Sequence, residues 1–430
     1  MSYHWDDESQ AWLQADDKKT SVVRARCIRL APEKYAASVM PHQFWLDTFQ
    51  DLLHELLESY MNGGGLRWQD RLLQRPMEAP HGWVAVGVQK AWELAVNKLE
   101  EDCKPFQAST QGIPEGLANL YELLERQIAL HPCKGTKTSV HLAGEDHLDP
   151  HPQLTMIQRI FSEVETSNQS QSMLLVQGSV GTRQQIGYSD LDLWMIVSNE
   201  ALADPHKLRQ LAKATFRINR CLFAFDPLQH HGVMLSSQID MYRYRESYLP
   251  VDAIAKASSL SPGQGSKLVF HVTPSSLGSG MSYFNMLSYL RSIVEKGTEI
   301  RTPFAIKGVL SCIMLLPALF EGAMGRPTFK GDSFDRVEKI VPFDIWSIMT
   351  EVSGVREGWN YRPPLLVNVV QNYVRNPFVF QYLLQRGLSG NLNHAYDHEL
   401  PSNWQQRSLA LAEYLWEHLC QSSTTSLSVT

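Results

Sequence analysis

Hydrophobic and polar residues alternate in short stretches near the middle of the chain, a pattern that predicts β-strands. Met173–Gln177 is a short apolar run of the kind that forms a buried strand. Residues 190–197 are apolar apart from acids at 190 and 192, and residues 233–242 alternate between apolar and polar side chains. Between these two segments, residues 204–222 have the apolar spacing of an amphipathic helix.

Helical periodicity dominates on both sides of this region. Helices are expected, in chain order, over residues 42–61, 84–99, 116–130, 281–296, 301–321, 342–388 and 403–420. One further strand is expected over 268–272. We therefore predict an α+β fold with a helical N-terminal region over residues 1–150, a mixed β-sheet unit over 151–250 and a helical C-terminal domain over 251–430.

Asp190 and Asp192 are the most informative residues of the chain. One residue apart in a strand, both carboxylates project from the same face, while Leu191 points to the other face. Two carboxylates held side by side repel each other, and a cation between them relieves the repulsion. Oxygen ligands favour magnesium, the usual companion of nucleoside triphosphates. The alternative is an acidic, solvated face on a half-buried strand.

The dipeptide Gly178-Ser179 favours the metal interpretation. It follows the first strand directly, and a ten-residue spacer ending in Ser189 separates it from Asp190. The amides and the hydroxyl of a tight Gly-Ser turn can bind a phosphate group. The turn is not a Walker loop, because the Gly-x-x-x-x-Gly-Lys-Ser/Thr spacing is absent.

Gly-Ser, a spacer of about ten residues and Asp-apolar-Asp-apolar resemble the signature of the nucleotidyltransferase superfamily related to DNA polymerase beta. The local sequence is similar to the catalytic segment of bacterial class I adenylate cyclases. The similar residues are Gly-Ser-Val-Gly-Thr at 178–182 and Ser-Asp-Leu-Asp-Leu-Trp at 189–194. Residues 239–245, Ile-Asp-Met-Tyr-Arg-Tyr-Arg, also resemble the cyclase segment that carries a third acid. The resemblance covers about a sixth of the chain.

This resemblance implies a nucleotidyltransferase-like palm, a mixed sheet backed by helices, that binds two magnesium ions, with manganese as the alternative metal. Asp190 and Asp192 would bridge the two ions, and Asp240, on the polar face of the strand over 233–242, would complete the shell of the second. An acceptor hydroxyl would attack the α-phosphorus of ATP or another nucleoside triphosphate, and pyrophosphate would leave. The alternative for Asp240 is a solvent-facing strand residue.

The same scheme requires nucleotide contacts. The candidates are Gly178, Ser179, Arg183, Ser189, Lys307 and Lys330. Arg183 can hold two phosphate oxygens with one guanidinium. Lys307 and Lys330 are similar to lysines of the helical domain that closes over the triphosphate in this superfamily. Their alternatives are a solvent-exposed loop residue for Arg183 and ordinary surface or helix-flanking positions for the two lysines.

Composition narrows the classes of partner. A net charge of −6 and a pI near 6.2 argue against a polynucleotide, which calls for a clustered basic surface. The longest apolar segment, residues 309–320, is interrupted by Pro317 and is too short to cross a bilayer. Six cysteines without Cys-x-x-Cys spacing and an acidic N-terminus without a signal-peptide pattern indicate a cytoplasmic protein with no membrane partner.

Three functions remain open at this point. The first is transfer of a nucleoside monophosphate to the hydroxyl of a small molecule or a protein. The second is an adenylate cyclase, in which the acceptor is the 3′-hydroxyl of ATP itself. The third is a catalytically inactive relative that binds nucleotide as a sensor or scaffold, and the presence of all three acids makes it the least favoured.

Overall fold

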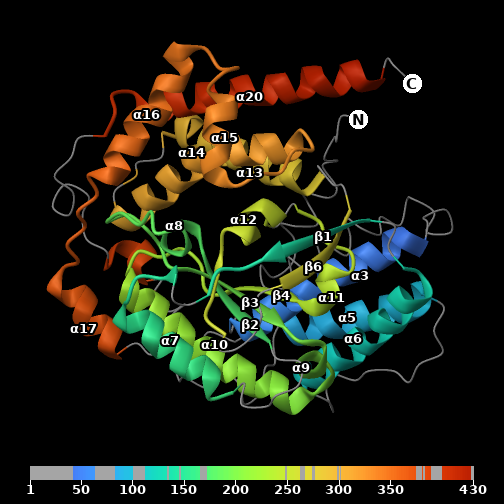
Figure 1. Cartoon of the computed structure of the whole chain (residues 1–430). Helices are drawn as coiled ribbons and strands as arrows, with labels where there is room; N and C mark the ends of the chain where they lie inside the picture. Colours follow the sequence, from blue (N-terminus) through green and yellow to red (C-terminus); the bar gives the residue numbers. More distant parts are fainter. Residues whose placement is uncertain are drawn as a thin grey trace.

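The fold is described from a computed structural model of the chain (Figure 1). The structure describes residues 42–62, 83–99, 112–132, 135–144, 147–164, 172–246, 249–261, 267–273, 277–297, 300, 302–373, 380, 383–388 and 400–427. These residues form an α+β fold in which helices surround two small β-sheets.

The central sheet has the strand order β4-β3-β2-β5. β2 (Met173–Gln177) lies antiparallel to β3 (Asp192–Val197), and β3 lies parallel to β4 (Met234–Ser237). β5 (Ser258–Ser259) pairs with β2 at the other edge. Because parallel strands need a crossover, α10 (Pro205–Phe225) connects β3 to β4, which confirms the helix predicted between them.

Local chemistry explains where α10 begins. The Asp204 side chain caps the helix, because its Oδ1 accepts a hydrogen bond from the backbone N–H of His206 at 2.8 Å. Pro205 occupies the first turn, where its missing N–H costs no helical hydrogen bond. The apolar stripe of α10 then packs into the same core as Leu193 and Met195 of the sheet. Short α9 (Asn199–Ala203) precedes it.

Both faces of the central sheet are buried, which explains the continuous apolar run in β3. Leu191, Leu193 and Met195 belong to a core shared with α10 and the N-terminal helices. Trp194 and Ile196 belong to a different core on the opposite face. Burial of each large apolar side chain contributes about 1.5–3 kcal/mol, so this alternation holds the register of β3.

The N-terminal region contributes a group of helices beside β4 (Figure 1). α3 (His42–Met61) packs against α5 (Trp83–Lys98), α6 (Ile113–Leu130), β4 and α10. α7 (Pro152–Ser162) lies along α10. The helices predicted over 42–61, 84–99 and 116–130 are therefore confirmed within a few residues.

A second, two-stranded sheet joins distant parts of the chain. β1 (Thr136–His141) pairs antiparallel with β6 (Lys267–Val272), with Thr136 opposite Val272. The strand predicted over 268–272 is confirmed, whereas its partner was not predicted. α12 (Val251–Ala255) lies beside β1. The pairing of β1 with β6, and of β5 with β2, crosses the boundaries predicted near residues 150 and 250.

Most of the C-terminal helices pack above the central sheet in Figure 1: α13 (Leu277–Glu295), α14 (Pro303–Ala323), α15 (Lys330–Val337), α16 (Phe343–Glu357) and α20 (Trp404–Leu427). α17 (Leu365–Tyr373) lies instead at the lower left, near α7 and α10, and a π-helical turn (Leu384–Leu388) follows it in the chain. α14 continues through Pro317 and is long and apolar enough to cross a membrane, but 67% of its most apolar window is buried inside the protein. It is the central helix of this C-terminal core.

The third predicted strand is shorter than the alternation over 233–242 indicates. β4 ends at Ser237, and Gln238–Met241 forms the one-turn helix α11. Oδ2 of Asp240 accepts hydrogen bonds from the backbone N–H of Ser237 at 2.7 Å and from its hydroxyl at 2.8 Å. This is a capping box, and its local hydrogen bonds outweigh the period-two pattern.

Asp240→Ala tests this structural role. The substitution leaves the buried N–H and hydroxyl of Ser237 without their acceptor, so the free energy of unfolding should fall by about 1–3 kcal/mol. Urea unfolding followed by circular dichroism measures the change, with Asp335→Ala, at an exposed position on α15, as the control. Unchanged stability would contradict the capping role.

Candidate functional site

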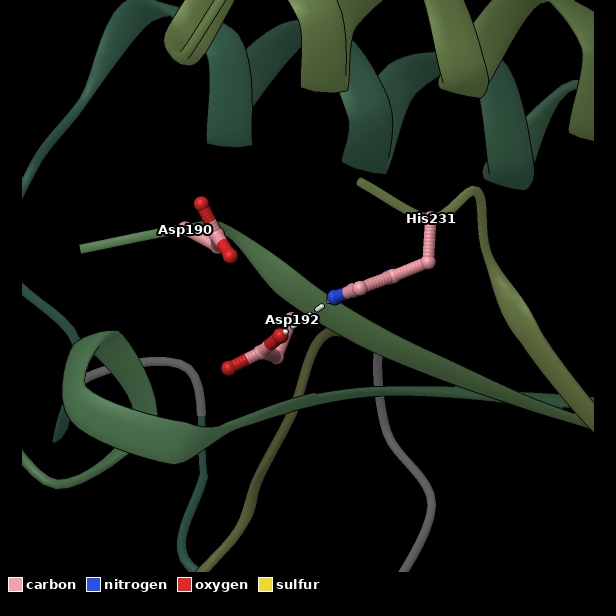
Figure 2. A group of neighbouring side chains, drawn as sticks. All are labelled: Asp190, Asp192 and His231. Atoms are coloured by element: carbon pink, nitrogen blue, oxygen red, sulfur yellow. Dashed lines mark ion pairs between the residues drawn. The ribbon is translucent and has the colours of Figure 1, made fainter. Parts of the chain in front are cut away.

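Asp190, Asp192 and His231 meet at one end of the central sheet. Asp192 is the first residue of β3, Asp190 lies just before it, and His231 lies in the loop that leads into β4. One ligand atom from each residue lies within 4.8 Å of the other two (Figure 2). Carboxylate oxygens and imidazole nitrogens bind divalent cations, so this group can hold a metal ion.

Gly178 is packed directly against the second acid. Gln177 pairs with Asp192 across β2 and β3, which brings the following glycine beside the carboxylate. A Cβ at position 178 would lie 2.2 Å from Oδ2 of Asp192, and the backbone φ of +66° is itself in the left-handed region. Both the space and the conformation therefore require glycine. The structure brings together the Gly-Ser dipeptide and the acid pair, as the sequence predicts.

Ser179 and Ser189 hold the ends of the spacer together. Ser179 lies in the one-turn helix α8 (Gly178–Gly181), and its hydroxyl is 2.8 Å from the hydroxyl of Ser189. The Ser189 hydroxyl oxygen also accepts a hydrogen bond from the backbone of Ile186 at 2.9 Å. Arg183 instead forms an ion pair with Asp149, at 3.6 Å between Nε and Oδ1, in an exposed loop. The structure thus gives Arg183 an acidic partner away from β3.

His231 is a partly exposed cation beside the acid pair. Its Nε2 lies 3.0 Å from Oδ1 of Asp192, and its Nδ1 lies 2.9 Å from the backbone oxygen of Gly232. Burial alone would lower the pKa of His231, but the hydrogen bond to Asp192 and the charges of Asp192 and Asp190 raise it to about 9. Both ring nitrogens then carry protons, which matches two acceptors. The His-His pair just before the third predicted strand was the sequence signal for this residue.

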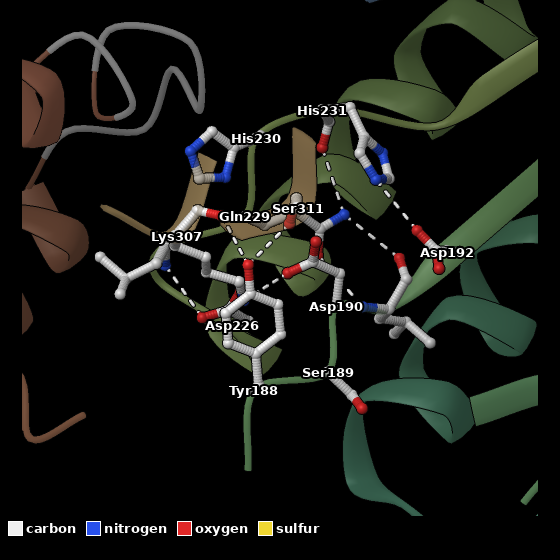
Figure 3. A network of polar contacts seen from close by, with 12 residues as sticks. Tyr188, Ser189, Asp190, Asp192, Asp226, Gln229, His230, His231, Lys307 and Ser311 are labelled. Atoms are coloured by element: carbon white, nitrogen blue, oxygen red, sulfur yellow. Dashed lines mark hydrogen bonds and ion pairs between the residues drawn. The ribbon is translucent and has the colours of Figure 1, made fainter. Parts of the chain in front are cut away.

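Lys307, predicted to contact phosphate, is the second cation beside the acid pair, and the structure buries it in ion pairs with two carboxylates. Its Nζ lies 2.5 Å from Oδ1 of Asp190 and 2.5 Å from Oδ2 of Asp226 (Figure 3), and the side chain is 1% exposed. Burial and the charge of Asp190 raise the pKa of Asp226. Burial alone would also raise the pKa of Asp190, but the positive charge of Lys307 has the larger effect and holds the pKa of Asp190 below its usual range. A buried lysine with two largely buried carboxylate partners is a counter-ion of the protein itself.

Tyr188 anchors the acid-bearing loop in the C-terminal core. Its hydroxyl lies 2.5 Å from the backbone oxygen of Lys307 and 2.7 Å from Oγ of Ser311. Its ring centroid lies 4.8 Å from Nζ of Lys307 and 4.5 Å from Cζ of Arg356. Tyr188 is 2% exposed and packs with the core of the C-terminal helices. The loop before β3 is therefore fixed by α14 and α16.

Lys330 and Arg356 form a basic pair on the same side. Lys330 begins α15, and Arg356 lies near the end of α16. Burial and the charge of Arg356 lower the pKa of Lys330 to about 8, while Asp192 and Asp190 act in the opposite sense. Among the residues that the structure describes, neither basic side chain has an acidic partner at ion-pair distance, and Nε of Arg356 is buried without a hydrogen bond. This pair is thus suited to an anion from outside the chain.

The structure does not bring Asp240 to the acid pair, which corrects the predicted third ligand. β3 and β4 are parallel, and Val197 lies opposite Ser237 at their far ends. Asp240 therefore follows the far end of β4. Asp192 lies at the other end of β3, five residues before Val197, which is a distance of about 16 Å at about 3.3 Å per residue. Its carboxylate binds Ser237 and also accepts a hydrogen bond from Gln50 at 3.3 Å. His231 occupies the third position instead.

Neither a family model nor a curated protein matches this chain. A cavity of 530 Å³ lies elsewhere, between β1 and α12, with Thr136, Glu246 and Asp252 among its lining residues. The acid group does not line that cavity.

Replacement of the two lysines separates the internal counter-ion from the unpartnered cation. Lys307→Met leaves the largely buried Asp190 and Asp226 without their cation and should lower the free energy of unfolding by about 3–5 kcal/mol. Lys330→Met breaks no ion pair and should change it by less than about 1 kcal/mol. Asp226→Asn in the Lys307→Met background should restore part of the loss. Equal destabilisation by the two single changes in urea unfolding would contradict these roles.

His231 leads to a pH prediction for the metal-free protein. Its pKa is about 9 in the folded state and about 6.5 in an unfolded chain, so its stabilisation is complete below about pH 6.5 and is lost as the pH rises to about 9. With a chelator present, the melting temperature of the wild type should fall over this range relative to His231→Gln. Because the pKa of Lys330 is lowered in the folded state, its loss of a proton increases stability as the pH rises. This contribution is the same in both proteins and cancels when their melting temperatures are compared. Parallel pH profiles would contradict a protonated His231.

Proposed function

We propose that this chain is a divalent-metal-dependent nucleotidyltransferase that transfers a nucleoside monophosphate from ATP, or another nucleoside triphosphate, to a hydroxyl group and releases pyrophosphate. One observation supports the proposal most directly. Asp190 and Asp192 form a site for a cation, and they lie near Lys330 and Arg356, which form a site for an anion. A metal ion bound to a triphosphate brings both charges in one ligand.

The residues present fit one divalent ion. Two carboxylates and the imidazole of His231 form a donor set that suits manganese as well as magnesium, once Nε2 of His231 has lost its proton. A bound ion supplies neutralisation of phosphate charge and a lowered pKa for a coordinated hydroxyl. Because Asp240 lies at the other end of β4, this group accounts for one ion rather than the two expected from the sequence.

The other side chains of the site bind the phosphates and leave space for the substrate. Lys330 and Arg356 bind the outgoing phosphates, and an anion beside Lys330 restores the full charge that burial and Arg356 disfavour. Gly178 leaves the side of Asp192 free of a Cβ. The acceptor oxygen forms a bond to the α-phosphorus, the bond from that phosphorus to the pyrophosphate oxygen breaks, and the hydroxyl proton passes to water.

The fold supports the same proposal. A mixed sheet with α10 and α7 against one face, and with the acids at the start of a central strand, has the layout expected of the palm. We extend the proposal to a cytoplasmic location, supported by free Cys221, Cys312 and Cys420 among the described residues and by the burial of α14.

A pyrophosphate-release assay tests the proposed activity. The purified chain is incubated with Mg²⁺ or Mn²⁺ and each α-labelled nucleoside triphosphate, alone and with a cell extract that supplies acceptors. We expect metal-dependent release of pyrophosphate. The rate should fall by at least about a hundredfold in Asp192→Asn, because this carboxylate is a ligand of the metal ion in the proposed site. Asp335→Asn, an exposed acid on α15, is the matched control and should retain the activity.

The products distinguish the remaining candidates. Cyclic AMP formed from ATP alone would identify the 3′-hydroxyl of the nucleotide as the acceptor, whereas label on a protein or metabolite would identify an intermolecular transferase. Metal-dependent nucleotide binding without turnover would indicate a sensor. Absence of both binding and turnover would contradict the proposal.

A further inference from the structure

The backbone between the two acids lies beyond the ladder of the central sheet. β2 ends with Gln177 opposite Asp192, and β4 begins with Met234 opposite Trp194. Leu191 is completely buried, and buried backbone N–H and C=O groups need partners. A loop side chain, rather than a strand, meets this need.

Gln229 supplies both partners. The backbone N–H of Leu191 donates to Oε1 of Gln229 at 3.3 Å, and Nε2 of Gln229 donates to the backbone oxygen of Leu191 at 3.1 Å. The side chain amide thus reproduces the two-bond pairing that a neighbouring strand residue would make. Gln229 is itself completely buried, so these bonds form away from solvent.

The same amide reaches the segment that carries the third ligand. Nε2 of Gln229 also donates to the backbone oxygen of His231 at 3.2 Å (Figure 3). One side chain therefore connects the residue between Asp190 and Asp192 with the backbone of His231.

The far side of the His231 turn is fixed independently. The backbone N–H of Val233 donates to Oδ1 of Asn219 on α10 at 2.8 Å, and Nδ2 of Asn62, directly after the end of α3, donates to the oxygen of Val233 at 2.9 Å. A Cβ at Gly232 would lie 2.7 Å from Asn219 and 2.8 Å from Asn62. With Val233 tied to the two helices, the bonds of Gln229 determine where the other end of the turn lies relative to β3.

We infer that Gln229 is a positioning residue that sets the distance between the acid pair and His231, and thereby the geometry of the proposed metal site. The inference rests on the proposed function only for its metal-binding consequence. The spacing of Asp192 and His231 exists without a metal, at 3.0 Å between Oδ1 and Nε2, and is measurable in the metal-free protein. Partners that orient metal ligands typically affect metal affinity by about 10–100-fold.

Gln229→Met tests this role, because methionine has a similar length and no hydrogen-bonding amide. Gln50→Met is the matched control: Gln50 is also a buried glutamine whose Nε2 binds backbone oxygens, those of Asp240 and Arg243, near the other end of β4. Both variants are compared with the wild type at a temperature where circular dichroism shows that all three are folded.

Two readouts are combined. In the metal-free protein, NMR follows the exchange of the Leu191 amide proton and the signal of the His231 Nε2 proton that bonds Asp192. Titration with Mn²⁺ alone, followed by electron paramagnetic resonance, measures metal affinity. Gln229→Met should speed exchange at Leu191 by at least about tenfold, remove the His231 signal and weaken Mn²⁺ binding by at least about tenfold. Gln50→Met should leave all three unchanged.

The two readouts separate failure of the inference from failure of the proposed function. A Gln229→Met protein that keeps the His231 signal overturns the inference, as does one that binds Mn²⁺ with wild-type affinity when the wild type binds it. Equal losses in the Gln50→Met control also overturn it, because they reveal a general structural effect. A wild type that binds no Mn²⁺ refutes the proposed metal site, and the two NMR signals then decide the inference.

Discussion

Electrostatic repulsion between closely spaced carboxylates is the constraint around which the middle of this protein is organised. Asp190, Asp192 and Asp226 gather at one end of the central sheet, where burial makes uncompensated charge costly. Lys307 neutralises the first and third from one side, and protonated His231 neutralises the second from the other. The fold can therefore form without a metal ion while keeping the acids close together.

This compensation joins parts of the chain that the sequence suggests are separate. Lys307 comes from the central helix of the C-terminal core, and Tyr188 inserts the acid-bearing loop into that core. Leu191, only three residues later, packs into the core shared with the N-terminal helices. The candidate site thus lies where two hydrophobic cores meet, and both must be assembled for the acids to hold their positions.

Individual elements were predictable where one local signal dominated. Met173–Gln177 and α10 follow from apolar patterning, and the contact of Gly178 with Asp192 follows from two motifs on paired strands. The alternation over residues 233–242 predicts a strand through Asp240, but the Ser-x-x-Asp capping box, also a local signal in the sequence, ends β4 at Ser237. The family resemblance predicts a phosphate contact for Lys307, and no sequence pattern reveals Asp226 as its second partner.

The sequence by itself determined the acid pair, the glycine turn that accommodates it and the strand and helix that carry them, because each depends on neighbours within a few residues. Only the tertiary structure decided that His231 joins the acids, that Lys307 is an internal counter-ion and that Gln229 bridges the two segments. The hydrogen bond between Gln229 and Leu191 spans 38 positions of the chain, and the ion pair between Lys307 and Asp226 spans 81. Such pairings depend on strand order and helix packing, which residue patterns along the chain do not encode.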